Sequence, residues 1–228
     1  MVPWELLDTA DIPGGGTLRL KRRGSEYSIM LGTTELMNSR LGGSEEALAR
    51  LPLARIAGRP GPRILIGGLG MGFTLRAALA AVGPDAEIVV AELVPAVVSW
   101  ARGSMADLFA TSLADARVTL HEGDVAGPIG ARRSAWDAIL LDVDNGPEGL
   151  TTPANDRLYG PSGLQAAHAA LRPGGVLAVW SSAPDAAFGR RLRSAGFGVE
   201  EEAVRATGKR GARHVVWVAT ETDRSSRY

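Results

Sequence analysis

Acidic side chains follow a glycine-rich turn at intervals along this chain. The turn is I-L-I-G-G-L-G-M-G (64–72), in which Gly68, Gly70 and Gly72 alternate with larger residues. Glycine lets the backbone turn sharply and lets a ligand approach main-chain atoms closely. Glu92 lies twenty residues beyond Gly72, where a carboxylate can accept hydrogen bonds from ribose hydroxyls. The spacing predicts a nucleoside-containing ligand with Glu92 on its sugar, rather than a solvated charge at a strand end.

Acids also follow two later segments that are predicted to be strands. Asp124 and Val125 follow the run at 117–121, and an acid there can accept a hydrogen bond from the amine of adenine, although aspartate is also common in turns. D-V-D-N-G-P (142–147) follows the run at 136–141 directly. Turn formation would explain N-G-P, but it would not explain why Asp142 comes straight after I-L-L. We expect these polar groups to gather at one edge of a sheet.

Strands and helices must alternate to bring these residues together. Apolar runs predict strands that end at the glycine turn and span 87–92, 117–121, 136–141 and 176–180, with helices at 73–82, 161–171 and 183–195. Residues 172–175, R-P-G-G, are predicted to end the second of these helices. The segments 197–206 and 214–220 predict a terminal hairpin. This order predicts an α/β fold with a parallel sheet and an antiparallel edge.

The glycine spacing narrows the kind of fold. G-x-G-x-G differs from the dinucleotide pattern G-x-G-x-x-G, because Phe73 stands where that pattern has its third glycine. It resembles motif I of the class I S-adenosylmethionine-dependent methyltransferases. That resemblance implies a Rossmann-like class I methyltransferase fold, with a seven-stranded, mostly parallel sheet and a C-terminal antiparallel hairpin. It also implies S-adenosylmethionine as cofactor, bound by residues of the turn and of the strand ends: Gly68, Gly70, Met71, Gly72, Glu92, Asp124, Val125 and Asp142.

From about Tyr27 to Thr220 the chain is similar to the spermidine synthase family, which is built on that fold. L-P-L (51–53), the Leu75-Arg76 pair and the acid-rich loop at 142–147 carry the similarity. The family has a small β domain before its core, which the strand-like segments 17–20 and 26–31 fit in reduced form. A helix at 44–51 follows, with Ser44 at its cap and Glu45 and Glu46 in its first turn.

The same similarity implies a division into two parts and a homodimer. We expect residues 1–58 to form the small N-terminal β region with a linking helix. Residues 59–228 are expected to form the Rossmann-like domain that binds S-adenosylmethionine.

Two departures from the spermidine synthase pattern bear on the reaction. Met71 stands where the family has an acid that pairs with the ammonium of decarboxylated S-adenosylmethionine. Losing such a pair is worth about 1–3 kcal/mol, which favours S-adenosylmethionine with its carboxylate. Asp142 matches the first acid of the family's D-S-S-D-P loop, but Asn145 replaces the second and cannot act as a base. Asp144 is the neighbouring substitute.

These departures predict methyl transfer to a small-molecule amine by in-line displacement, which needs alignment and a desolvated cleft. Asp142, Asp144 and Asn145 would face the reacting groups. Side chains that could line or close the acceptor pocket are Tyr159, Trp180, Glu45 and Glu46. One alternative is aminopropyl transfer despite Met71, and a second is a non-catalytic, cofactor-binding dimer.

Composition excludes several other classes of function. The 25 basic and 25 acidic residues balance, so strong attraction to nucleic acid or to an acidic membrane is not expected. With no cysteine, thiolate chemistry is excluded, and the three histidines lie far apart, so no metal site is expected. No signal peptide or membrane span is visible, and we expect a cytoplasmic protein.

Overall fold

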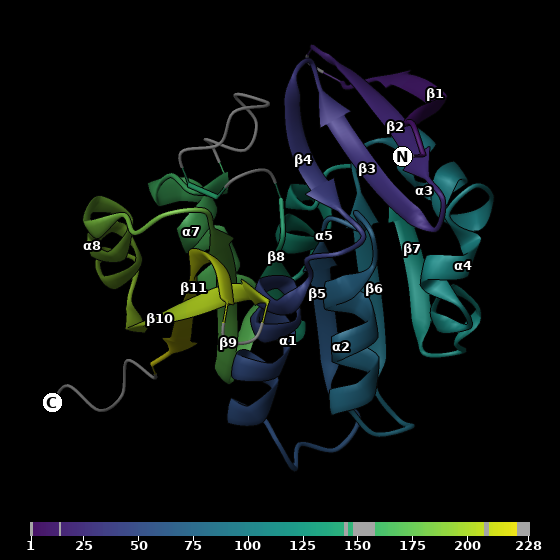
Figure 1. Cartoon of the computed structure of the whole chain (residues 1–228). Helices are drawn as coiled ribbons and strands as arrows, with labels where there is room; N and C mark the ends of the chain where they lie inside the picture. Colours follow the sequence, from purple (N-terminus) through teal and green to yellow (C-terminus); the bar gives the residue numbers. More distant parts are fainter. Residues whose placement is uncertain (1, 14, 144–145, 148–157, 208–209, 223–228) are drawn as a thin grey trace, which may run out of the picture.

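An N-terminal group of four strands precedes a longer alternation of helices and strands (Figure 1). The computed structural model describes all residues except 1, 14, 144–145, 148–157, 208–209 and 223–228. The strands are β1 (Glu5–Asp11), β2 (Thr17–Arg23), β3 (Glu26–Leu31), β4 (Thr34–Asn38), β5 (Arg63–Gly67), β6 (Glu87–Glu92), β7 (Val118–Glu122), β8 (Trp136–Leu141), β9 (Leu171–Ser181), β10 (Phe197–Thr207) and β11 (Arg210–Glu221). The helices are α1 (Gly43–Arg55), α2 (Phe73–Ala81), α3 (Pro95–Arg102), α4 (Ala106–Phe109), the short 3-10 helix η1 (Ser112–Ala114), α5 (Ala126–Ala131), α7 (Pro161–Ala170) and α8 (Ala186–Ser194).

The larger sheet has seven strands in the order β10-β11-β9-β8-β5-β6-β7. Strands β5 to β9 pair in parallel, and β11 runs antiparallel to both β9 and β10. Successive residues of β5 point to opposite faces, so Ile64 and Ile66 join the core on one side and Leu65 joins the core on the other. Helices α1, α2 and α3 contribute to the first core, and α5, α7 and α8 to the second. The predicted Rossmann-like fold of the class I methyltransferases, with its terminal hairpin, is confirmed.

The four N-terminal strands form a separate antiparallel sheet above the carboxyl ends of the parallel strands (Figure 1). Leu18, Leu20 and Ile29 of this sheet are buried in the same apolar cluster as α1, α2 and α3. The indole nitrogen of Trp100 on α3 donates a hydrogen bond to Asp8 Oδ2 at 2.6 Å, which ties the sheet to the larger core. Sequence patterns predicted two of these strands. Strands β1 and β4 were missed because neither shows a clear alternation of buried and exposed side chains, and most side chains of β1 are exposed.

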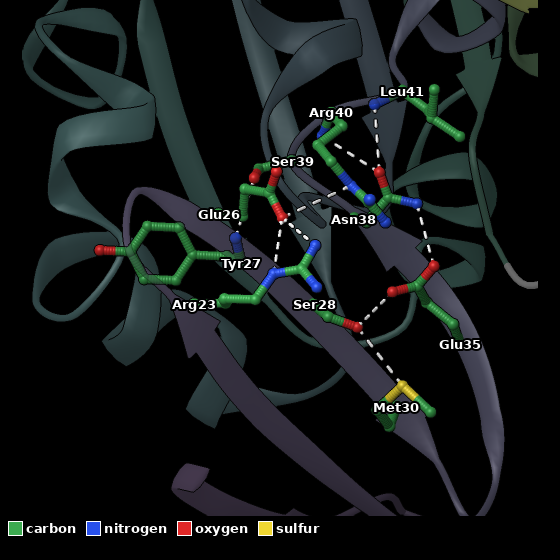
Figure 2. Close-up of polar contacts among 10 residues, drawn as sticks. All are labelled: Arg23, Glu26, Tyr27, Ser28, Met30, Glu35, Asn38, Ser39, Arg40 and Leu41. Carbon is green, nitrogen blue, oxygen red and sulfur yellow. Dashed lines mark hydrogen bonds and ion pairs between the residues drawn. The ribbon is translucent and has the colours of Figure 1, made fainter. Parts of the chain in front are cut away.

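A network of polar contacts holds the hairpin of β3 and β4 and the chain that leaves it (Figure 2). Ser28 Oγ donates to Glu35 Oε1 at 2.6 Å, and Asn38 Nδ2 donates to Glu35 Oε2 at 3.1 Å. Asn38 Oδ1 accepts hydrogen bonds from the backbone amides of Arg40 and Leu41, both at 3.1 Å. These contacts fix the turn that leads from β4 into α1, and so fix where α1 begins.

Helix α1 differs from its prediction at both ends. Gly42 caps it without a side-chain hydrogen bond, whereas Ser44 was expected at the cap. The helix also continues through Pro52 to Arg55, beyond the expected end at residue 51. Buried side chains on both sides of the proline, including Leu48 and Leu53, pack into the core and outweigh the hydrogen bond that proline removes.

Strand β9 begins at Leu171, so the turn predicted at 172–175 lies within a strand. The pairing of β8 with β9 shifts register between Trp136 and Ala138, which accommodates the proline and the two glycines as an irregularity in the sheet. Two other expectations stay predictions: the boundary after residue 58 and the homodimer. In the part of the chain that the structure describes, no helix is long and apolar enough to cross a membrane.

Candidate functional site

A pocket opens at the carboxyl ends of β5, β6 and β8, where ligands bind in open α/β sheets. Its floor comes from the glycine turn and from the ends of those strands. Its roof is apolar and comes from the N-terminal sheet and the loops beside it: Ile12, Leu18, Ile29, Leu36 and Met37. The small sheet therefore covers the edge at which the sequence predicted the polar groups to gather.

The glycine turn is pressed between the two strands that flank β5. Gly68 has a φ of +92°, and a Cβ atom placed there would lie 2.2 Å from the carbonyl oxygen of Asp142. The amide of Gly68 donates to the carbonyl of Ala91 at 2.8 Å. Gly72 caps α2 with a left-handed backbone. Gly68, Gly70, Met71 and Gly72 all line the pocket, as the sequence predicted.

Glu92 reaches the pocket from the end of β6, and its carboxylate braces the glycine turn. Its Oε2 accepts a hydrogen bond from the amide of Leu69 and its Oε1 accepts one from the amide of Val94, both at 2.9 Å. Burial raises the pKa of Glu92. The backbone amides of Gly70 and Leu93 also act on this carboxylate and, like those of Leu69 and Val94, lower its pKa against the effect of burial. Ribose binding by Glu92 stays a prediction.

Asp124 and Val125 border the pocket where β7 leads into α5. Asp124 Oδ1 accepts a hydrogen bond from the amide of Ala126 at 2.8 Å, which orients this turn. Val125 is buried and packs against Gly67. Both residues line the pocket, and adenine binding by them stays a prediction.

Two carboxyl groups from distant elements face the same space. Asp142 Oδ2 accepts a hydrogen bond from the Thr74 hydroxyl at 2.7 Å, and the same hydroxyl lies 3.3 Å from the carbonyl oxygen of Glu45. Burial, and secondly the charge of Glu45, raise the pKa of Asp142 to about 7. Burial also raises the pKa of Glu45. Glu46, in contrast, pairs with Arg50 at 2.8 Å on the helix surface, so only Glu45 of this acid pair lines the pocket.

Ser44 connects Glu45 to a histidine that the sequence did not link to the site. Ser44 is fully buried, and its hydroxyl donates to Glu45 Oε2 at 2.6 Å. The Ser44 hydroxyl oxygen also lies 2.9 Å from Nδ1 of His214, a residue on β11 that is 170 positions away in the sequence. The His214 ring packs edge-on against Trp180, with 4.8 Å between ring centroids, and Trp180 lines the pocket. The sequence contains a serine beside two acids and a histidine in the last strand, but no rule of sequence spacing predicts that these residues lie together.

The described lining of this pocket is acidic. It includes Glu45, Glu92, Asp124 and Asp142, but no lysine, arginine or histidine. The nearby cation Arg76 donates through Nη1 to the carbonyl oxygens of Met71 and Leu108, at 2.9 and 2.8 Å. Such a lining favours a cationic ligand, because an anionic group would find no cationic side chain there.

The remaining predicted site residues have different outcomes. Asp144 and Asn145 lie outside the described residues. Trp180 lines the pocket, as expected. Tyr159 is not among the lining residues: it is 2% exposed and packs edge-on against Phe188, with 5.7 Å between ring centroids.

Comparison with known proteins gives a consistent similarity. No family model matches the chain. Over 145 residues the chain is 33% identical to the polyamine aminopropyltransferase of Mycobacterium tuberculosis H37Rv, and the match covers 60% of this chain. The chain spans 27% of the length of that relative, and the Mycobacterium bovis protein of the same name matches equally.

Solved structures of spermidine synthases share the fold. The Thermotoga maritima enzyme has a TM-score of 0.77 at 18% identity, covering 95% of this chain and 72% of that one. A spermidine synthase in complex with the transition state analogue AdoDATO has a TM-score of 0.78 at 18% identity, covering 95% and 73%. TrmN from Thermus thermophilus has a TM-score of 0.57 at 24% identity, covering 90% and 59%. The predicted resemblance to spermidine synthases is thus confirmed, and the fold is shared more widely.

These similarities show that the prediction of a small-molecule amine methyltransferase was wrong. The sequence relatives named above are polyamine aminopropyltransferases, and two solved structures with TM-scores above 0.7 are spermidine synthases. The prediction relied on Met71 as a missing acid, but an acid absent from one position says little when Asp142 and Glu45 bring carboxylates to the same pocket. The names of these relatives agree with the broader expectation of a transferase, and the form of S-adenosylmethionine that this chain binds stays a prediction.

Proposed function

We propose that this chain transfers an aminopropyl group from decarboxylated S-adenosylmethionine to a small-molecule amine. The acidic pocket is the observation that carries this proposal. The proposed donor has a positive sulfonium and a positive ammonium but no carboxylate, so it matches a lining of four acids. The carboxylate of S-adenosylmethionine would face those same acids without a cationic partner.

Each part of the pocket has a role in this proposal. The glycine turn lies under the adenosine, Glu92 accepts from the ribose hydroxyls, and Asp124 and Val125 border the adenine. Asp142 pairs with the ammonium of the donor and takes the place of the acid missing at Met71. The apolar roof from the N-terminal sheet excludes water, which strengthens the attraction between opposite charges.

The reaction needs alignment more than it needs a covalent intermediate on the protein. The donor supplies an activated carbon beside the sulfonium, with a neutral thioether as the leaving group. The chain holds that carbon in line with an acceptor nitrogen and keeps the nitrogen unprotonated. Asp144 and Asn145 follow β8 in the sequence and stay candidates for contact with the acceptor.

Binding and product analysis test the proposal together. In titration calorimetry we expect decarboxylated S-adenosylmethionine to bind at least about ten-fold more tightly than S-adenosylmethionine, which corresponds to ~1.4 kcal/mol. Mass spectrometry after incubation with a panel of diamines and polyamines is expected to detect aminopropylated products. Tighter binding of S-adenosylmethionine, or products that gain a methyl group, would overturn the proposal.

A further inference from the structure

We propose that Glu45, Ser44 and His214 form a proton relay that takes a proton from the acceptor amine and delivers it to the protein surface. This inference rests on the proposed function, because an amine stored as an ammonium must lose a proton before it can attack. The carboxylate that the spermidine synthase pattern uses for that step is replaced by Asn145, an amide, so the chain needs a base from another element.

The three groups form a continuous hydrogen-bonded path. Glu45 lines the pocket at the first turn of α1, and the Ser44 hydroxyl lies 2.6 Å from its Oε2. His214 Nδ1 lies 2.9 Å from the same hydroxyl. Ser44 is 0% exposed, so it has no contact with bulk water, while His214 on β11 is partly exposed. The path therefore begins in the pocket, crosses a buried hydroxyl and ends near solvent.

The packing of helix α1 and of the His214 ring holds the residues of this path in place. Helix α1 packs against β9, β10 and β11, and a Cβ atom at Gly43 would lie 2.9 Å from the carbonyl oxygen of Ala206 on β10. The edge-on contact with Trp180 limits rotation of the His214 ring. Backbone packing, together with their own hydrogen bond, thus holds the side chains of Ser44 and His214 next to each other.

The charged surroundings suit a proton acceptor at Glu45. The groups that interact with it or with its partners are Asp142 directly after β8, Glu92 from β6, Glu46 on the same helix and Arg76 on α2, which interacts with Glu46. Burial raises the pKa of Glu45, which makes it a stronger base, and burial lowers the pKa of His214, which keeps the ring neutral and able to accept.

Each proton is accounted for along the path. An N–H bond of the acceptor ammonium breaks and a Glu45 O–H bond forms, which leaves a neutral amine. Glu45 then passes that proton to Ser44 Oγ while the Ser44 hydroxyl proton moves to Nδ1 of His214, and the Nε2 proton of the imidazolium goes to solvent. The amine lone pair then forms the new C–N bond as the C–S bond breaks and its electrons stay on sulfur. Glu45 ends as a carboxylate, Ser44 as a hydroxyl and His214 as a neutral ring with its proton on Nδ1. Exchange with solvent returns His214 to the Nε2–H tautomer for the next cycle, and one proton is released per turnover.

Three variants and a pH profile test the relay. Ser44→Ala cuts the path, and His214→Asn keeps a hydrogen-bonding group near Nδ1 that cannot titrate. Glu45→Gln removes the first acceptor. At pH 7 we expect Ser44→Ala and His214→Asn to lower kcat by about 100-fold with little change in the affinity for the sulfonium donor. Glu45→Gln is expected to lower kcat by a similar factor and also to weaken donor binding, because Glu45 is one of the four acids that line the pocket. The loss should shrink toward pH 10, where an alkyl amine with a pKa near ~10.4 deprotonates in water.

Glu46→Gln is the matched control, because Glu46 lies on the same helix but pairs with Arg50 outside the pocket. It is expected to retain wild-type kcat at every pH. If Ser44→Ala and His214→Asn keep the wild-type pH profile, or lose the same factor at pH 7 and pH 10, the relay is wrong even though the wild type transfers aminopropyl groups. If the wild type transfers none to any amine, the proposed function itself fails.

Discussion

Asp142 lies in an environment that departs clearly from water. It lies beside Glu45, accepts one hydrogen bond from Thr74, and has a pKa raised to about 7 from 3.8. Near neutral pH its carboxyl group is therefore divided between the protonated and ionised forms. A cationic ligand stabilises the ionised form, so ligand binding and proton release are coupled at this residue.

Asp142→Asn is expected to stabilise the ligand-free protein at alkaline pH. A carboxyl group with a raised pKa in the folded state binds its proton more tightly there than in the unfolded chain. Its ionisation therefore lowers the free energy of unfolding as the pH rises above the unfolded pKa, and this loss of stability is complete above pH ~7. The melting temperature of wild type should fall between pH 5 and pH 8 more than that of the variant, by scanning calorimetry. Equal slopes in the two proteins would contradict the raised pKa.

The same variant should bind the sulfonium donor more weakly. Removing one charge of a partly desolvated pair costs about 1–3 kcal/mol, or roughly ten- to hundred-fold in affinity. Titration calorimetry at pH 8, where wild-type Asp142 is ionised, measures this loss. Undiminished affinity would show that Asp142 does not contact the donor's cation.

At the scale of elements, the turn between β5 and α2 sets the shape of the pocket floor. Its position depends on main-chain contacts on two sides, with Ala91 in β6 and with Asp142 after β8. Side chains would separate these strands, and so the turn needs glycine where the backbones meet.

Gly68→Ala is expected to distort this turn. The added methyl would lie 2.2 Å from a backbone oxygen that cannot rotate away, at a φ of +92° that costs a residue with a side chain about 1–3 kcal/mol before the clash is counted. We expect a lower free energy of unfolding in urea and loss of donor binding. Gly83→Ala is the control: its methyl would meet no atom within 4 Å, so it should change stability by less than about 0.5 kcal/mol. Similar stability of both variants would contradict the close approach.

At the scale of the whole molecule, the small sheet and the larger sheet share one apolar core. Leu20 of β2 and Leu48 of α1 are both fully buried in the cluster that also contains Ile64 of β5. The pocket lies between these two bodies, so its roof and floor depend on their joint folding. A boundary after residue 58 would then separate the two sheets in the sequence, but it would not separate two units that unfold independently.

Leu20→Ala tests whether the two sheets unfold together. Removing a fully buried leucine side chain lowers the free energy of unfolding by about 2–5 kcal/mol. If the two sheets share one core, native-state hydrogen exchange should show the same loss of amide protection in β2, β3, β5 and β8. Leu6→Ala, at a leucine of the same sheet that is 53% exposed, should have almost no effect. Loss of protection confined to residues 1–58 would instead identify an independent N-terminal domain.

The sequence by itself determined the parallel strands, the glycine turn and the acids at the strand ends. Those features depend on residues that are neighbours in the chain: apolar runs form buried strands, and glycines permit the turn that follows. Sequence also sufficed for the likeness to spermidine synthases, but it led to the prediction of a methyltransferase, which was wrong, because Met71 was judged without the groups around it.

Only the tertiary structure decided which acid of the pair at 45 and 46 enters the pocket, and that Ser44 joins His214 rather than capping a helix. The packing of α1 against β9, β10 and β11 sets both, through backbone contacts between residues far apart in sequence. Local patterns carry no information about such contacts. The charge of a pocket is likewise a sum over side chains from several elements, and it exists only once the fold has brought them together.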